Sequence, residues 1–217
     1  MGSITRSFAN NITTSGVLLP ASLNNNSIAN VTAYNAAVAT GNMVLISSQT
    51  ASNSSSISFT TGIDSTYKEY QFYFIDIHPR TAAPAFQFNL STDSGSNYNV
   101  TKTTTFVQVY HSETNDADSS FTYVPSVDLA QSTSFQTISH DIGSGADECG
   151  AGILTLFNPS STTYVKHFIS SANNTYSSYT QNHYMAGYAN TTSAINAVQF
   201  KVGSGNFDGT ILMYGIK

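Results

Sequence analysis

The chain has 217 residues, of which 9% are charged, 40% hydrophobic and 12% aromatic, and its net charge is −5 at pH 7. The hydrophobic content excludes a wholly disordered chain, and the excess of acidic residues disfavours nucleic acid, which binds through Lys and Arg contacts with phosphates. No apolar run approaches the roughly 20 residues that span a bilayer, so we expect no membrane insertion.

Residues 1–42 differ from the rest of the chain because they are rich in Asn and their apolar residues follow neither the helix nor the strand period. We predict an extended N-terminal docking arm. Such a segment cannot bury enough apolar surface by itself to offset the entropy lost on ordering. Its order is expected to come from packing against another chain. The apolar residues available for this docking are Phe8, Ile12, Val17, Leu18, Leu19 and Ile28.

From residue 43 onward, short segments rich in Val, Ile, Thr, Tyr and Phe alternate with Gly, Ser, Asn and Asp clusters, a pattern typical of strands and turns. The predicted strands are Met43–Thr50, Ser56–Thr60, Glu69–His78, Ala85–Ser91, Thr103–His111, Phe121–Val127, Phe135–His140, Gly150–Phe157, Tyr164–Ser171, Tyr179–Tyr188, Ala197–Val202 and Thr210–Ile216.

This spacing, without a convincing helical period, predicts one all-β domain over residues 43–217, an antiparallel β-sandwich of jelly-roll-like type. Val198, Phe200 and Val202 should face the core, with Gln199 and Lys201 opposite them. Both faces are apolar from 72 to 77 and from 211 to 216. These two segments therefore resemble central strands, or strands that a second subunit covers.

No catalytic constellation stands out. The chain lacks a Gly-x-Ser-x-Gly elbow, and each of its five His residues lies in a predicted strand or at its end. The lone Cys149 follows two acidic residues, which raise a thiol pKa. We therefore expect no enzymatic activity. One cysteine cannot form an internal disulfide, and the N-terminus does not resemble a signal peptide, so we expect synthesis in a reducing cytoplasm.

The acidic residues of a Gly-rich loop, Asp141, Asp147 and Glu148, are weak candidates for calcium ligands. Their spacing does not match an EF-hand loop, so the expectation is a solvated loop with no metal and no cofactor. The same acids are the only local cluster that could supply the paired carboxylates of a glycan-degrading enzyme, the least favoured alternative.

Aromatic residues are the second set of candidate site residues. Four tyrosines lie in or beside segments rich in Asn and Ser, where a ring can stack on a sugar and amides can bind its hydroxyls. Packing in the core or in an interface is the competing interpretation. The candidate glycan contacts are Tyr98, Tyr176, Tyr179 and Tyr184.

Five stretches carry a family resemblance: 8–14, 24–32, Ile63–Pro79, Leu156–Phe168 and Ser204–Gly215. They resemble virion proteins of tailed bacteriophages, of a kind common in phages of marine bacteria. The resemblance spans most of the chain, but its motifs are strands and turns rather than active-site signatures. It carries no functional residues across.

The resemblance implies a structural protein of the particle: a tail fibre, an adhesin or a head fibre or decoration, made in the host bacterial cytoplasm. Its implied partners are other virion proteins and further copies of itself, with a trimer expected by analogy alone. A glycan-binding module that recognises host-surface carbohydrate is the alternative, and the two roles are compatible at a fibre tip.

Overall fold

A computed structural model describes residues 42–81, 83–115 and 117–217 of the chain. The strands are β1 (Met43–Ser54), β2 (Ser56–Phe59), β3 (Glu69–Pro79), β4 (Phe86–Ser91), β5 (Lys102–Ser112), β6 (Ser119–Tyr123), β7 (Gln136–Ser139), β8 (Gly150–Phe157), β9 (Lys166–Tyr176), β10 (Tyr179–Ala189), β11 (Ala197–Val202) and β12 (Phe207–Ile216). A short 3-10 helix, η2, covers Pro125–Val127. The predicted docking residues lie outside the described part of the chain.

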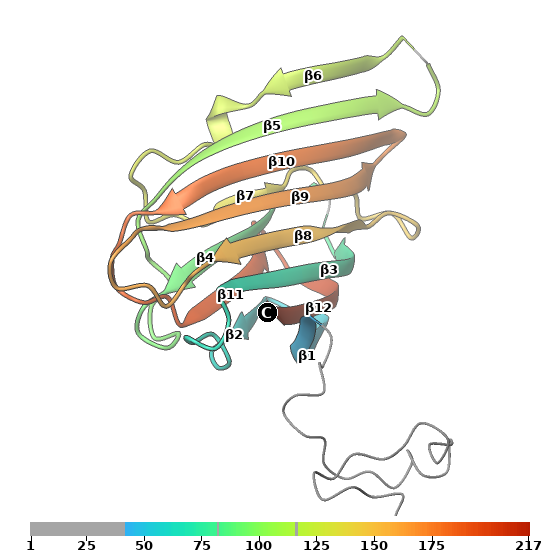
Figure 1. Ribbon diagram of the computed structural model, residues 1–217. Helices are drawn as coiled ribbons and strands as arrows, with labels where there is room; N and C mark the ends of the chain where they lie inside the picture. Colours follow the sequence, from blue (N-terminus) through green and yellow to red (C-terminus); the bar gives the residue numbers. More distant parts are fainter. Residues whose placement is uncertain (1–41, 82, 116) are drawn as a thin grey trace, which may run out of the picture. The chain divides into compact units, whose positions relative to one another are not determined.

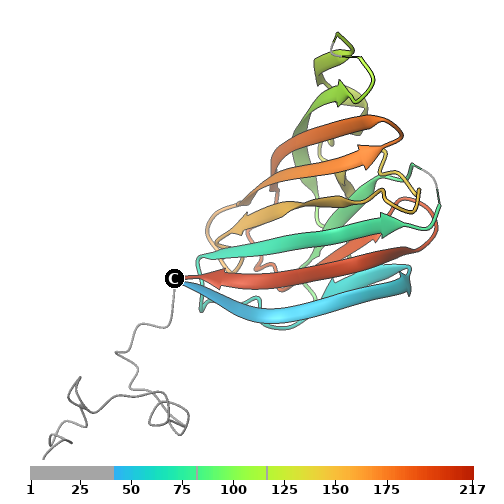
Figure 2. The same cartoon turned by 90° about the vertical axis from the view of Figure 1, so that its right-hand side faces the viewer.

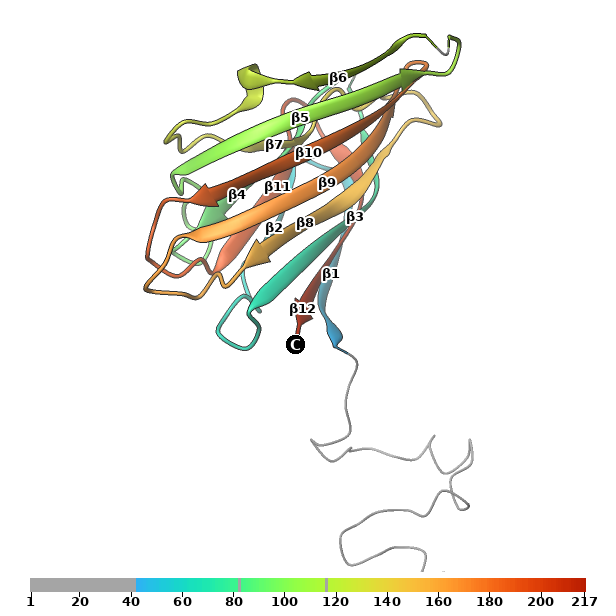
Figure 3. The ribbon, with the colours of Figure 1, turned by 45° about the horizontal axis from the view of Figure 1, so that its top comes forward.

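The strands form two antiparallel sheets that pack as a sandwich (Figures 1 and 3). The larger sheet has eight strands in the order β1-β12-β3-β8-β9-β10-β5-β6, and the smaller has four in the order β2-β11-β4-β7. In Figure 3 the smaller sheet lies behind the larger one. The predicted all-β antiparallel sandwich is confirmed.

Side-chain alternation explains how the strands form and which side each sheet buries. Along β9, buried and exposed positions alternate almost without exception, and Val198, Phe200 and Val202 of β11 are buried while Gln199 and Lys201 are partly exposed. Strands β3 and β12 are interior strands of the larger sheet, as their apolar sequences predict. Figure 2 shows β12 (red) between β1 (blue) and β3.

Most predicted strands have somewhat different limits in the structure: β1 continues to Ser54 and β12 begins at Phe207, for example, and two further differences have a clear cause. The segment predicted as Phe121–Val127 is a strand only to Tyr123, because Pro125 lacks a backbone N–H and begins the 3-10 helix. The strand predicted to end at Ser171 continues to Tyr176, since Asn173 and Asn174 pair with β10. Asn suggests a turn only where no partner strand holds the backbone extended.

The space between the sheets has two chemically different ends. Between β3 and β12 on one side and β2, β11 and β4 on the other lies a cluster of phenylalanines, in which Phe200 lies within about 6.2 Å of four other rings, measured between centroids. Between β5, β9 and β10 and the small-sheet strands β4 and β7, the buried residues include Asn89, Lys102, Gln136 and His183. Within the described residues, no helix is long and apolar enough to cross a membrane.

Candidate functional site

The outer face of the eight-stranded sheet, which points away from the small sheet, is almost free of charge. Two adjacent rows of residues run across the strands on this face, and each row contains one residue from each of seven strands. The first row is Leu45, Tyr214, Gln71, Thr155, Ile169, Ala186 and Thr105. The second is Leu212, Tyr73, Ile153, Ser171, Tyr184, Val107 and Tyr123. None of these residues is charged.

Large apolar side chains on this face are open to solvent. Leu45, Ile169 and Tyr184 are 52%, 54% and 51% exposed, and at the sheet edge Phe121 and Tyr123 reach 75% and 55%. Leu45 lies on β1 at one edge of the sheet, whereas Ile169, Tyr184, Phe121 and Tyr123 lie on β9, β10 and β6 toward the other edge. Single exposed apolar residues are ordinary, but a group of them on neighbouring strands is typical of a binding surface.

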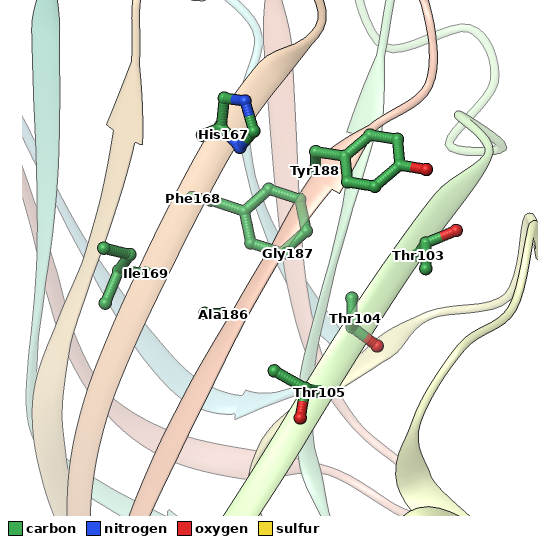
Figure 4. A pocket seen from close by; sticks show the side chains of 9 residues that line it. All are labelled: Thr103, Thr104, Thr105, His167, Phe168, Ile169, Ala186, Gly187 and Tyr188. Atoms are coloured by element: carbon green, nitrogen blue, oxygen red, sulfur yellow. The ribbon is translucent and has the colours of Figure 1, made fainter.

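A groove of about 500 Å³ crosses this face over β9, β10 and β5 (Figure 4). On the outer face it is open over Ala186, a small residue of β10 that lies between Ile169 and Thr105. A Cβ at Gly187 would lie 2.5 Å from the carbonyl oxygen of Thr103 and 3.0 Å from the Phe168 ring, so only glycine fits there. The full lining is Thr103, Thr104, Thr105, His167, Phe168, Ile169, Ala186, Gly187 and Tyr188.

One end of the groove is held by polar contacts. The Gln131 side-chain amide donates to Thr103 Oγ1 at 2.7 Å and to the Tyr188 hydroxyl at 3.3 Å. The Gln131 amide oxygen in turn accepts from Asn190 at 2.6 Å. The Tyr188 ring lies 6.1 Å from the His167 ring, measured between centroids. The tyrosine is therefore fixed in place at the mouth of the groove.

The groove can bind a small ligand but has few groups that could take part in catalysis. Its walls supply apolar surface, threonine hydroxyls and one imidazole, and its lining contains no carboxylate and no thiol. A ligand with an apolar ring face and a few hydroxyls suits these groups. The groove is not evident from the sequence, because only the strand register places Ala186 between Ile169 and Thr105 on the outer face.

The structure places the four predicted glycan-contact tyrosines in three separate locations. Tyr98 lies in the loop before β5, and its hydroxyl is buried without a hydrogen-bond partner among the described residues. Tyr176 and Tyr179 are paired across the β9–β10 turn, where the Tyr179 hydroxyl donates to Asp118 at 2.7 Å. Only Tyr184 lies on the outer face, one row from the groove.

Two carboxylates of the acidic loop, those of Glu148 and Asp141, already have polar partners. Glu148 accepts backbone N–H groups from Gly145 at 2.6 Å and Ser177 at 2.5 Å. Asp141 lies 2.9 Å from the His140 imidazole, measured between Oδ2 and Nδ1. Across the described residues, no three His, Cys, Asp or Glu side chains come together as a set that could hold a metal ion.

A buried Ser–His pair resembles part of a hydrolase site but is built differently. Ser139 Oγ donates to Asn174 Oδ1 at 3.0 Å and lies 3.2 Å from His183 Nδ1, so the imidazole is the donor to the hydroxyl oxygen. Burial, with a contribution from His140, lowers the pKa of His183 to about 3. The side chains of His183 and Ser139 are out of reach of any substrate, since the residues are 0% and 2% exposed.

Burial, followed by the nearby charge of Asp76, also raises the pKa of the Cys149 thiol, which disfavours a reactive thiolate.

Comparison with models of protein families, with curated proteins and with solved structures finds no match. The chain's own residues and geometry are therefore the basis for a functional proposal.

Proposed function

We propose that the chain is a structural component of a tailed-phage virion, docked by residues 1–42 and displaying its β-sandwich on the particle surface as a fibre or decoration. The observation that carries the proposal is the pair of uncharged cross-strand rows on the outer face of the eight-stranded sheet. The resemblance of Ile63–Pro79, Leu156–Phe168 and Ser204–Gly215 to phage virion proteins supplies the kind of assembly.

The physical argument concerns the cost of burying a surface. Charged groups lose hydration when a partner covers them, whereas Thr, Ser and aromatic side chains lose much less. The centres of protein interfaces are accordingly poor in charge and rich in Tyr and Phe. The two rows on the outer face have this composition, which suits a chain whose neighbours are other virion proteins and copies of itself.

The test is to locate the chain in the particle. We expect mass spectrometry of purified virions to detect it, and gold-labelled antibodies against the sandwich to mark one site on the particle surface. A chain lacking residues 1–42 should remain folded by circular dichroism and fail to enter particles. Absence of the protein from purified virions would contradict the proposal.

A second candidate function is recognition of host-surface glycan, which the groove specifically favours. Tyr188 offers a ring face at one end, Thr103 and Thr105 offer hydroxyls along one wall, and Ala186 keeps the floor open. These residue types are suited to neutral sugars, with ring stacking on one side and hydroxyl contacts on the other.

Calorimetric titration with host surface polysaccharide tests this second role. We expect Tyr188→Ala to weaken binding at least tenfold and Tyr164→Ala to leave it unchanged, because Tyr164 is a 72% exposed tyrosine that does not line the groove. Equal binding by both variants, or no binding by the unaltered chain, would rule out the groove as the glycan site.

A further inference from the structure

Strand β6 is one of the two edge strands of the eight-stranded sheet, the other being β1. It pairs with β5 on one side, and among the described residues no strand pairs with its other side. Four of its five residues are exposed and one is partly exposed, so both of its faces are open. In Figure 1 it forms the uppermost edge of the sheet.

An edge strand of this kind presents backbone N–H and C=O groups that another strand can pair with. Natural proteins usually protect such an edge with a charge, a proline or a bulge. The sequence of β6 is Ser-Ser-Phe-Thr-Tyr, with none of the first two, and its register with β5 is regular over all five residues. The edge is therefore ready for strand addition.

The side chains beside this edge form an apolar surface, here called the edge patch. Phe121 lies opposite Val109 and Tyr123 opposite Val107, and Tyr184 follows Val107 in the same row. The edge patch is defined as Val107, Val109, Phe121, Tyr123 and Tyr184. A hollow of about 360 Å³ adjoins it between β5 and β6 and could receive an aromatic side chain.

We propose that the edge patch and strand β6 bind a second copy of this chain, with the two β6 strands paired antiparallel around Phe121. The inference rests on the proposed structural role, but it is tested on the purified chain alone. In this arrangement the two outer faces join into one continuous surface, and each Phe121 lies beside the other.

The regular edge identifies the occupant as a second copy, because two identical β6 strands related by a two-fold axis can pair antiparallel through the same five residues. Each chain carries a net charge of −5, so two copies repel at long range and the contact must be made through residues that carry no charge. None of the five residues of the edge patch is charged. Two carboxylates lie at its rim, where Asp118 accepts a hydrogen bond from Tyr179 and Asp128 accepts one from Tyr123.

The size of the surface fits a weak to moderate self-association. If a fully exposed aromatic side chain offers about 200 Å², then Phe121, Tyr123 and Tyr184 together expose roughly 350 Å². A standard interface buries about 800 Å² per partner. The valines of the edge patch and the β6 backbone contribute toward the remainder.

Sedimentation of the full chain tests the proposal. We expect self-association at micromolar concentration that strengthens with added salt, because salt screens the repulsion between the two acidic copies. Phe121→Lys should weaken association at least tenfold, since it places two positive charges face to face. Tyr164→Lys is the matched control, because Tyr164 is 72% exposed but lies outside the patch, and it should associate like the unaltered chain.

Cross-linking tests the strand pairing itself. In a Cys149→Ser background, Phe121→Cys should form a disulfide between two chains on mild oxidation, and Tyr164→Cys should not. A monomeric unaltered chain overturns the inference, as does a Phe121→Lys variant that stays folded by circular dichroism and associates normally. A monomer found in virions would overturn the inference and leave the proposed function intact; a patch-dependent oligomer absent from virions would do the reverse.

Discussion

The two ends of the space between the sheets solve the problem of burial in opposite ways. At the aromatic end, Phe72, Phe74, Phe86 and Phe200 pack ring against ring, with two pairs edge to face, one tilted and one stacked. At the polar end, an amide and an amine that are both fully buried meet directly, since Lys102 Nζ donates to Asn89 Oδ1 at 2.5 Å and to the Val100 carbonyl at 2.8 Å.

The comparison shows that two different kinds of interaction can stabilise the two ends of one sandwich. Ring packing is stabilised by area and shape, so it responds to lost volume and hardly to pH. A buried hydrogen-bond network is stabilised only while every member has its partner, so it responds to lost partners and to protonation. Four experiments separate these two responses.

The largest loss of stability is expected at the aromatic end, from Phe200→Ala. Phe200 is fully buried and contacts Phe59, Phe72, Phe74 and Phe86. Removing such a ring should lower the free energy of unfolding by about 4 kcal/mol, through lost transfer energy and the cavity left behind. Urea titration measures the loss. Tyr164→Ala serves as an exposed control, and a comparable loss in that variant would contradict the assignment of the core.

The next largest loss is expected at the polar end, from Asn89→Ala. The Asn89 amide donates to the carbonyls of Tyr98 and Thr133, and its oxygen accepts from Leu90 N–H and Lys102. The substitution leaves these groups buried without a partner, which should cost about 3 kcal/mol of unfolding free energy. The exposed Asn97→Ala is the control in the same urea titration. A loss below about 1 kcal/mol would show that water replaces the amide.

The pH dependence of stability should distinguish the two ends through Lys102. Burial lowers the pKa of Lys102 from 10.5 to about 7, so the folded chain favours the neutral amine. Its contribution is complete above pH 10.5 and is lost as the pH falls toward about 7, by about 2 kcal/mol between pH 9 and 7. Lys102→Met should flatten this slope in urea titrations. An unchanged slope would assign it to other groups.

The smallest expected effect concerns His183, whose lowered pKa of about 3 compares with an ordinary 6.5. The neutral imidazole stabilises the fold fully above pH 6.5, and this contribution is lost as the pH falls through 6.5 toward 3. Between pH 6.5 and 5.5 the loss should be about 1 kcal/mol. Thermal unfolding of His183→Gln should show less acid sensitivity than the unaltered chain. Equal sensitivity would place the acid response elsewhere.

Much of the fold could be predicted from the sequence, because alternation in segments such as Val198–Val202 is a local signal. The pairing of β1 with β12 and the unequal division into eight and four strands could not, since they depend on contacts between distant residues. Lys102 illustrates the same limit. A lysine in a strand is normally exposed, and only its neighbours across the sandwich explain why this one is buried.

The candidate site was harder to predict than the fold. The Asn and Ser residues around Tyr176 and Tyr179 predict sugar contact, but these tyrosines lie at a strand turn and not on the face that carries the groove. The groove depends on Ala186 being small while Ile169 and Thr105, beside it on the two neighbouring strands, are larger. That relation is set by register, which residue type alone does not reveal.

The position of β12 in the larger sheet also constrains the order in which the chain can fold. It lies between β1 and β3, and it pairs Ile216 with Met43, which lies at the other end of the domain in sequence. Neighbouring strands such as β9 and β10 can pair early, but β1 has no partner in its sheet until residues 207–216 arrive. Closing so long a loop is slow, and until it closes β3 has an open edge. Completion of the sheet is therefore the step at which temperature and chaperones should most affect the yield of folded chain.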